Sequence, residues 1–379
     1  MIASDNMMND SRRIIFSVLL LISLASGSCS LFKAKKAAPP PAFRFPLIED
    51  GRLTYDGEIN DRLQAAGGKI FFSTKKGFVY AVDAGAKKAD WRFAAKSSIS
   101  LPPSLGPDEI IIADSEGHIY GIDFGGRLRW EKKLEEKVIY EILQFRDKAF
   151  MLTDAGQVVA LEAGTGTEMW RFRPDGAIRT TAVFWNERLI LGTDGGKFQL
   201  VDCRRGTAAG VFVTGSEITR LLFVDENRLY FSLEEGSLQC LNLAALERRW
   251  KTKCGGTLTA APVVDEGRVY FITSNNVLFC LDKKGGDIIW WRPLPSRSSF
   301  SPAFCGEQVI ASSHSPLLAG FNKKNGEKTG SYEAARELKS NPLTIGDYVF
   351  INLYDPDTAK GVLVSLKSEK PAEEKAEKK

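Results

Sequence analysis

The chain has 379 residues, of which 44% are hydrophobic and 26% charged, an ordinary globular composition with ample length for a large core. Its formal net charge of +4 comes from two short segments: Lys33, Lys35 and Lys36 supply +3, and residues 367–379 contain five Lys against four Glu. The sequence between them is close to neutral, whereas nucleic-acid-binding proteins usually carry a basic stripe. The charge distribution therefore argues against a nucleic-acid partner.

Residues 1–28 are predicted to be a signal peptide for export. Arg12 and Arg13 form a basic start, and the apolar run from residue 14 to residue 25 is too short to span a bilayer. Small residues follow this run up to Cys29. This order of a basic start, an apolar run and small residues is typical of a secretory signal.

Cys29 is the candidate lipidation site. The small residues before it resemble a bacterial lipobox, which implies diacylglyceryl transfer to the Cys29 thiol and cleavage before that residue. Ser26 stands where Leu is usual, a departure that spirochaete lipoproteins tolerate. The acyl chains would anchor the protein to a bacterial membrane, and we expect the outer membrane, facing the periplasm. The alternative is an ordinary cleavable signal followed by an incidental cysteine.

Residues 29–42 predict a flexible linker after the lipidated cysteine, because this stretch is polar and contains three consecutive prolines. From residue 43 to residue 366 the sequence then repeats itself about every 40 residues. In the first unit, an apolar stretch at 69–73 leads to a Gly77 turn, a second stretch at 79–83 and a third near Trp91. Corresponding stretches begin at residues 69, 110, 149, 189, 229, 269, 309 and 348.

Each unit has the pattern of a propeller blade. Its stretches alternate apolar and polar residues and are separated by glycine turns, and another short segment precedes each unit, often after a proline. A helical repeat would show a 3.6-residue period, and a β-solenoid would have shorter coils. The sequence therefore predicts an all-β fold, an about eight-bladed β-propeller of four-stranded antiparallel blades.

The eighth unit lacks a last strand in this pattern. No tryptophan segment follows Leu366, and residues 367–379 predict a disordered charged tail. Residues 43–46 (Phe-Arg-Phe-Pro) are similar to the segment that begins at Trp170. We therefore expect an N-terminal strand to complete the eighth blade and close the ring, with no open edge between first and last blades.

The repeat resembles the tryptophan-docking repeat of the pyrroloquinoline quinone (PQQ) family. An acidic residue ends a strand, a glycine turn follows, and a tryptophan stands eight residues after the acid, as in Asp83 to Trp91. The match weakens where Gly210 and Gly330 replace tryptophan. The resemblance covers residues 43–366 and implies that each tryptophan packs over the next blade while its N–H finds a backbone acceptor. The structural docking residues are Trp91, Trp130, Trp170, Trp250 and Trp290.

Several other repeated residues are predicted to be structural. The strand-ending acids can accept hydrogen bonds from the turns that follow them; they are Asp83, Asp123, Asp202 and Asp282. The cysteines after Cys29 are expected to be small buried apolar residues; they are Cys203, Cys240, Cys254, Cys280 and Cys305.

The sequence offers little for catalysis. The two histidines, His118 and His314, fall in the turn regions of blades two and seven, too far apart for a shared metal site. The resemblance to PQQ enzymes implies a calcium ion, an aspartate base and often a disulfide between adjacent cysteines. No Cys-Cys pair occurs, and no calcium-ligand set can be matched. We therefore expect no catalytic residue, no cofactor and no metal site.

The loops that join successive blades are the expected recognition surface, because variable loops on a rigid scaffold commonly bind partners. A lipid anchor and bare blades are similar to the family members that serve in outer-membrane β-barrel assembly. This resemblance implies a non-catalytic scaffold that binds envelope proteins, as a monomer or within a hetero-complex. The alternatives are a PQQ-dependent oxidoreductase and an envelope propeller that binds glycan or another ligand. Candidate partner-binding residues, in or beside joining loops, are Tyr140, Arg179, Arg220 and Arg297.

Overall fold

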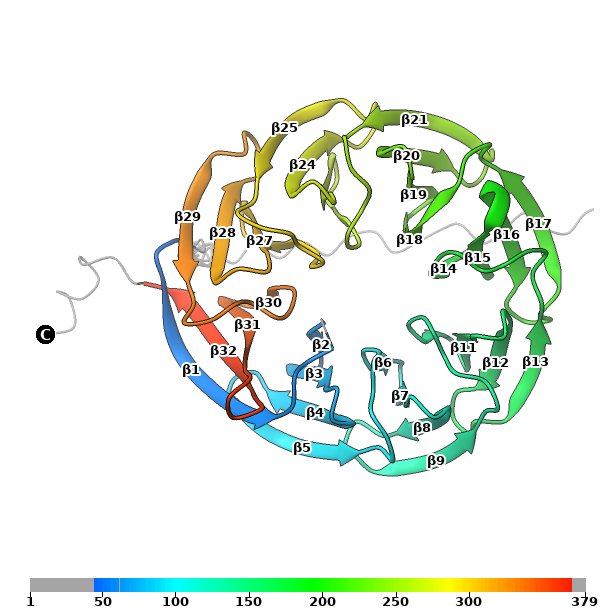
Figure 1. The fold of residues 1–379 in the computed structure, drawn as a ribbon, viewed down its shortest axis with the longest axis horizontal. Helices are drawn as coiled ribbons and strands as arrows, with labels where there is room; N and C mark the ends of the chain where they lie inside the picture. Colours follow the sequence, from blue (N-terminus) through cyan, green and yellow to red (C-terminus); the bar gives the residue numbers. More distant parts are fainter. Residues whose placement is uncertain (1–43, 61, 370–379) are drawn as a thin grey trace, which may run out of the picture. The chain divides into compact units, whose positions relative to one another are not determined.

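A computed structural model of the chain describes residues 44–60 and 62–369. The chain divides into two units, residues 1–40 and 41–379, and all described residues belong to the second. Within it, 32 strands form eight four-stranded antiparallel sheets. The sheets follow one another around a ring (Figure 1), which confirms the predicted eight-bladed propeller.

Each blade runs from an inner to an outer strand. The first blade is β2 (Gln64–Ala66), β3 (Lys69–Ser73), β4 (Phe78–Asp83) and β5 (Lys88–Ala94); the second is β6 (Ser104–Leu105), β7 (Ile110–Ala113), β8 (His118–Ile122) and β9 (Leu128–Lys133). The third is β10 (Leu143–Phe145), β11 (Lys148–Leu152), β12 (Val158–Glu162) and β13 (Glu168–Phe172); the fourth is β14 (Val183–Trp185), β15 (Arg188–Thr193), β16 (Lys197–Asp202) and β17 (Ala208–Val213), with a 3-10 turn at Asp194–Gly196. The fifth is β18 (Ile218–Asp225), β19 (Arg228–Leu233), β20 (Ser237–Asn242) and β21 (Glu247–Lys253); the sixth is β22 (Val263–Val264), β23 (Arg268–Ile272), β24 (Val277–Asp282) and β25 (Ile288–Pro293). The seventh is β26 (Ala303–Cys305), β27 (Gln308–Ser312), β28 (Leu317–Asn322) and β29 (Lys328–Glu333); the eighth is β30 (Leu343–Ile345), β31 (Tyr348–Asp355), β32 (Lys360–Ser368) and β1 (Leu47–Asp56).

The core lies between the blades. The middle strands are buried on both faces, so consecutive residues such as Ile70, Phe71 and Phe72 are all fully buried. Phe71 packs with Ile110 of the second blade, whereas Ile70 and Phe72 pack with Phe350 of the eighth. The alternation expected for every stretch is therefore wrong for the middle strands: because both of their faces are buried, they are nearly continuous apolar runs, and only the outer strands alternate with polar residues.

The N-terminal strand closes the ring as predicted, although different residues form it. β1 pairs antiparallel with β32, from Leu47 opposite Ser368 to Asp56 opposite Lys360. The segment at 43–46, chosen for its similarity to a tryptophan strand, precedes β1. Its Phe45 packs against the core of the seventh blade. The similarity thus reflects docking of an aromatic ring rather than strand pairing, and β32 ends two residues beyond the predicted end at 366.

Each docking tryptophan links its blade to the next one. The indole N–H groups of Trp91, Trp130, Trp170, Trp250 and Trp290 donate to the carbonyl oxygens of Phe124, Ala163, Cys203, Lys283 and Lys323 at 2.9, 2.7, 3.3, 3.2 and 3.0 Å. Every ring also lies over a glycine in the following blade, and a β-carbon on any of these glycines would collide with it. In each of these five blades, the tryptophan contacts fix the position of the following blade.

The fourth blade departs from this pattern in a consistent way. In the five blades with a docking tryptophan, a small residue opposes it on the neighbouring strand, for example Ala160 opposite Trp170. In the fourth blade Leu200 opposes Gly210, so the large and small residues have exchanged strands. The next blade correspondingly has Leu246, at φ 53°, in the turn where a glycine receives the tryptophan elsewhere. Leu200 of the middle strand β16 therefore packs into the core between the fourth and fifth blades, where other blades use a tryptophan of the outer strand.

The five cysteines of the described part are buried and free of disulfides. Cys240 and Cys280 lie opposite Trp250 and Trp290, where a thiol is small enough to fit beneath an indole ring. Burial raises the pKa of Cys240 to about 11 and that of Cys280 to about 12, so both thiols stay protonated near neutral pH. They behave as small apolar side chains.

The strand-ending acids hold the turns that follow them. Asp123 Oδ1 accepts hydrogen bonds from the backbone N–H of Gly125 and of Arg127, both at 2.9 Å. The bond from Arg127 N–H is the main cause of a lowered pKa at Asp123. Asp202 accepts from the N–H groups of the next turn in the same manner. Because these carboxylates are engaged with their own turns, they define blade geometry rather than a reactive site.

Candidate functional site: the joining-loop face

The joining-loop face consists of two kinds of segment: the loops from each outer strand to the next inner strand, and the turns between the second and third strands. In the second blade, Ser115 N–H donates to Ser98 O of the entering loop at 2.8 Å. Leu134 N–H of the leaving loop donates to Gly117 O at 2.9 Å. Equivalent bonds recur around the ring, so the turns and loops lie together on one face.

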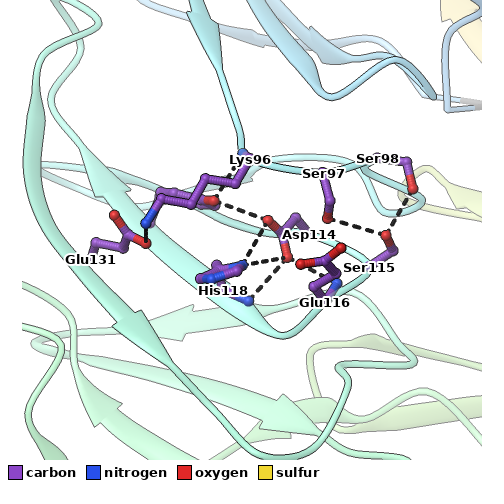
Figure 2. Close-up of polar contacts among 9 residues, drawn as sticks. Lys96, Ser97, Ser98, Asp114, Ser115, Glu116, His118 and Glu131 are labelled. Carbon is purple, nitrogen blue, oxygen red and sulfur yellow. Dashed lines mark hydrogen bonds and ion pairs between the residues drawn. The ribbon is translucent and has the colours of Figure 1, made fainter.

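The second blade shows how firmly a joining loop can be held (Figure 2). Lys96 N–H donates to the Tyr120 hydroxyl at 3.0 Å, and that hydroxyl donates to Asp114 Oδ2 at 2.9 Å. Nδ1 of His118 lies 3.1 Å from the same Asp114 oxygen. Ser98 Oγ contacts Ser115 Oγ at 2.8 Å beside this chain of bonds. These contacts within the protein hold the loop in place, so a partner would bind a preorganised loop at a small cost in conformational entropy.

Burial by itself would raise the pKa of Asp114, whose side chain has no exposed surface. The hydrogen bonds that it accepts from His118 N–H, the Tyr120 hydroxyl and Glu116 N–H outweigh burial and lower that pKa. Burial also raises the pKa of Tyr120 to about 12. The pair therefore consists of a carboxylate and a neutral phenol at neutral pH, a stable structural arrangement.

A hollow of about 350 Å³ opens at the centre of the ring, lined by inner segments of blades on opposite sides. Across it, Arg62 Nη1 of the first blade forms an ion pair with Glu141 Oε2 of the third at 2.6 Å. Asn341 Oδ1 of the eighth blade accepts from Leu63 N–H at 3.0 Å. The ion pair thus joins the non-adjacent blades one and three, whereas the hydrogen bond joins the neighbouring blades eight and one.

The predicted partner-binding residues fall at separate places on this face. Tyr140 lines the central hollow. Arg179 is exposed and lines a second hollow, over the fourth and fifth blades. Arg297 is exposed beside His314 in a third hollow, over the sixth to eighth blades. Arg220 lies in β18, and its side chain is outside the described atoms. Tyr140, Arg179 and Arg297 thus lie in joining loops at three separate hollows, whereas Arg220 lies in a strand rather than in a loop.

Two features of the face escaped the sequence prediction. The hollow at Arg179 also has carboxylates from Asp194, Glu217 and Glu234. Two of them bind nearby backbone: Glu217 accepts from Gly195 N–H at 3.0 Å, and Asp194 accepts from Ala177 N–H at 3.1 Å. The second feature is the ion pair between Arg62 of the first blade and Glu141 of the third. Its signal was the placement of oppositely charged residues at matching points of units one and three.

The described residues do not fit the calcium-dependent quinone site that the repeat family implies. Glu141 is the one carboxylate among the described residues that line the central hollow, and it is already paired with Arg62. In residues 44–60 and 62–369, no three His, Cys, Asp or Glu side chains gather closely enough to hold a metal ion.

Cys29, the predicted lipidation site, lies outside the described residues. Within residues 44–60 and 62–369, no helix is long and apolar enough to cross a membrane.

Eight blades linked by docking tryptophans, with their joining loops gathered on one face, define a β-propeller of the PQQ-like repeat type. A family model described as outer membrane protein assembly factor BamB matches residues 49–147, 125–211 and 211–354. The chain belongs to that family, in agreement with the resemblance seen in its repeat.

Solved structures share this fold at low sequence identity. BamB from Moraxella catarrhalis is 14% identical, with a TM-score of 0.71, and the match covers 85% of this chain and 100% of that one. A europium-containing methanol dehydrogenase is 12% identical, with a TM-score of 0.66 and coverages of 85% and 93%. Saccharomyces cerevisiae Sqt1 is 9% identical, with a TM-score of 0.69 and coverages of 86% and 99%. Since an enzyme stands among them, these similarities show the fold alone. No curated protein sequence matches the chain.

Proposed function

We propose that this chain is an exported, lipid-anchored and non-catalytic scaffold that binds envelope proteins during outer-membrane β-barrel assembly. The observation that carries the proposal is the family match across most of the propeller. The joining-loop face supports it, because its loops are held in place by turn contacts while Arg179 and Arg297 stay exposed. Arginine on a rigid loop is well suited to bind partner carboxylates.

Partner binding can be tested with the full chain in bacterial membranes. After crosslinking, the wild type is expected to capture envelope proteins of the outer-membrane assembly machinery, identified by mass spectrometry. The test variant replaces three joining-loop residues and the strand residue Arg220, all named from the sequence, by alanine: Tyr140, Arg179, Arg220 and Arg297. We expect loss of at least one assembly partner with an unchanged melting temperature.

A matched control changes exposed charges on the opposite face, in the turns between third and fourth strands or at the first residue after such a turn: Lys284→Ala and Lys324→Ala in turns, and Lys88→Ala at the start of β5. This control should retain every partner. If the loop variant captures the same set as the wild type, the joining-loop face is the wrong surface. Capture of no envelope protein by the wild type would contradict the scaffold proposal itself. A PQQ absorbance band after addition of PQQ and Ca²⁺ would favour an oxidoreductase instead.

The lipid anchor has its own test. Metabolic labelling with palmitate should tag the wild type but not Cys29→Ala, because Cys29 supplies the thiol that the lipobox resemblance implies. Cys203→Ala is a suitable control, since Cys203 is buried and should leave labelling unchanged. Equal labelling of wild type and Cys29→Ala would show that the cysteine is incidental.

A further inference from the structure

The outer strand of the fourth blade differs from the other seven. β17 has the sequence Ala-Ala-Gly-Val-Phe-Val, whereas every other described outer strand contains at least one Lys, Arg, Asp or Glu. Charged side chains on an edge strand normally discourage pairing with another chain. Val211 and Val213 are each 56% exposed. β17 thus lacks the usual protection of an edge.

The backbone of β17 presents an unoccupied edge. Thr214 N–H donates to Gly196 O at 2.8 Å, which marks this pair as a hydrogen-bonded position of the β16–β17 ladder. Bonded and unbonded positions alternate along an antiparallel ladder. Val213 and Val211 precede Thr214 by odd numbers of residues in an unbroken register, so their N–H and C=O groups point away from β16. β17 is the last strand of its sheet in the described structure.

Nothing in the fourth blade covers this edge. Gly210 stands where other blades carry the docking tryptophan, and a β-carbon built there would meet no atom within 4 Å. Ala208 and Ala209 are small and exposed. Phe212, which points to the other side, stacks on Phe198 at 6.4 Å between ring centroids and so holds β17 on its sheet. An incoming strand would therefore meet a flat and anchored edge.

The surroundings of β17 are basic. Arg173, which follows β13, and Arg205, in the turn before β17, are exposed and form no ion pair with a described residue. The neighbouring outer strand β21 carries exposed Arg248, Arg249 and Lys253, which likewise have no ion-pair partner among the described residues, and these three positive charges outnumber the single exposed Glu247 of the same strand. Screening by salt weakens such exposed charges but does not remove them. The field around the neutral edge favours an acidic partner.

We infer that β17 binds an extended segment of a partner protein as a fifth strand of the fourth blade. The segment has alternating apolar side chains that cover Val211 and Val213, and acidic residues at its ends that meet the flanking arginines. Strand addition of this kind obtains affinity from main-chain hydrogen bonds and specificity from alternate side chains. The inference deepens the proposed function and rests on it, since it names a second surface and the chemistry of its partner.

A second copy of the chain is a poorer occupant. If two copies paired their β17 strands antiparallel about a two-fold axis, that axis would be perpendicular to the sheet. The same face of the fourth-blade sheet would then point to the same side in both copies. The basic strand β21 of each copy would then lie on that shared side and repel its counterpart. An acidic strand avoids this repulsion.

The test uses the purified propeller and a fluorescent peptide, Asp-Asp-Thr-Val-Thr-Val-Thr-Val-Asp-Asp, followed by fluorescence anisotropy. Val213→Pro removes an outward N–H without breaking a bond to β16. The matched control is Ala94→Pro, at the equivalent exposed position of β5 and equally free of a charge change. We expect Val213→Pro to raise the Kd about ten-fold or more, and Ala94→Pro to leave it within about two-fold.

Peptide controls separate strand pairing from charge attraction. A peptide with proline at two of its valines keeps the charge and should bind weakly, and a lysine-flanked peptide should bind weakly at low salt. Equal binding to wild type and Val213→Pro, or no binding to the wild type, overturns the inference. A dimer of the wild type that is lost in Val213→Pro, seen by sedimentation, assigns the edge to a second copy instead.

The two proposals fail separately. The fourfold joining-loop variant should still bind the acidic peptide, because none of its residues lies on β17. Loss of envelope capture with retained peptide binding would therefore count against the proposed function alone. Retained capture with no peptide binding would count against the β17 edge alone.

Discussion

Phe45 lies over Gly330 of the seventh blade, where five other blades carry a docking tryptophan. A β-carbon on Gly330 would collide with that of Phe45, and one on Gly320 would collide with the Phe45 ring. The aromatic ring that fills this site therefore comes from the opposite end of the chain. Such a contact ties the N-terminal segment to the seventh blade just before β1 enters the eighth.

Gly330→Trp should destabilise the protein by about 1–3 kcal/mol, because two aromatic side chains would compete for one site. Phe45→Ala should also destabilise it, by about 1–3 kcal/mol for a half-buried ring. In the double variant the tryptophan can occupy the vacated site. The double variant should therefore lose less free energy of unfolding than the sum of the losses in the two single variants. Urea unfolding of the four proteins measures this coupling. Simple additivity would contradict the overlap of the two sites.

Truncation should distinguish the role of β1 from that of the preceding segment. Removal of residues up to 46 deletes Phe45 but leaves the β1–β32 ladder, so only a modest fall in melting temperature is expected. Removal up to residue 56 also deletes Tyr55, a buried residue that accepts a hydrogen bond from Asn352 Nδ2. That longer truncation uncovers β32 along its length, and we expect aggregation or loss of the cooperative melt. Similar melts for both truncations would show that β1 does not complete the blade.

Much of the fold could be predicted because the repeat is expressed in local residues. Glycine turns, alternating stretches and the acid-to-tryptophan spacing define strands and blades without any long-range information. The closing segment was harder to place, because residues 43–46 look like a tryptophan strand for a reason unrelated to pairing. Phe45 occupies the place of a tryptophan ring, whereas the pairing residues of β1 contain no such signature.

The candidate surfaces were less predictable because they depend on curvature and register. Arg62 and Glu141 meet only because the ring turns blades one and three toward a common axis. The absence of charge in residues 208–213 is visible in the sequence. That Val211 and Val213 direct their backbone groups outward follows only from the β16–β17 register.

The docking of Trp130 on Gly166 allows a paired test of tryptophan packing. Gly166 has φ 71° and a β-carbon there would collide with the Trp130 ring, whereas Gly156 has φ 72° and open space around it. Both alanine substitutions introduce left-handed backbone strain of about 1–2 kcal/mol. Gly166→Ala should lose about 1–3 kcal/mol more, because the indole must move. Equal urea midpoints for the two variants would show that the ring is not tightly seated.

The hydrogen bonds to Asp114 imply a pH dependence of stability. Its pKa in the folded protein is lowered, mainly because accepted hydrogen bonds outweigh the opposing effect of burial. The carboxylate therefore stabilises the fold above its unfolded pKa of about 4, and this contribution is lost as pH falls through the lower folded value.

Asp114→Asn should destabilise the protein by about 1–3 kcal/mol at pH 7, because the charged acceptor of the Tyr120 hydroxyl and of two backbone N–H groups becomes a neutral amide. Below about pH 4 the Asp114 carboxylate of the unfolded chain takes up a proton, and the folded carboxylate does so only at its lower pKa, so the difference between the two proteins should shrink as the pH falls from about 4 through that lower value. Asp108→Asn, a change at an exposed acid of the same blade, should have little effect at either pH. Thermal melts of the three proteins from pH 7 down to pH 3 measure the trend. A difference for Asp114→Asn that stays constant over this range would mean that the negative charge of Asp114 does not stabilise the loop, and that the side chain acts only through its shape.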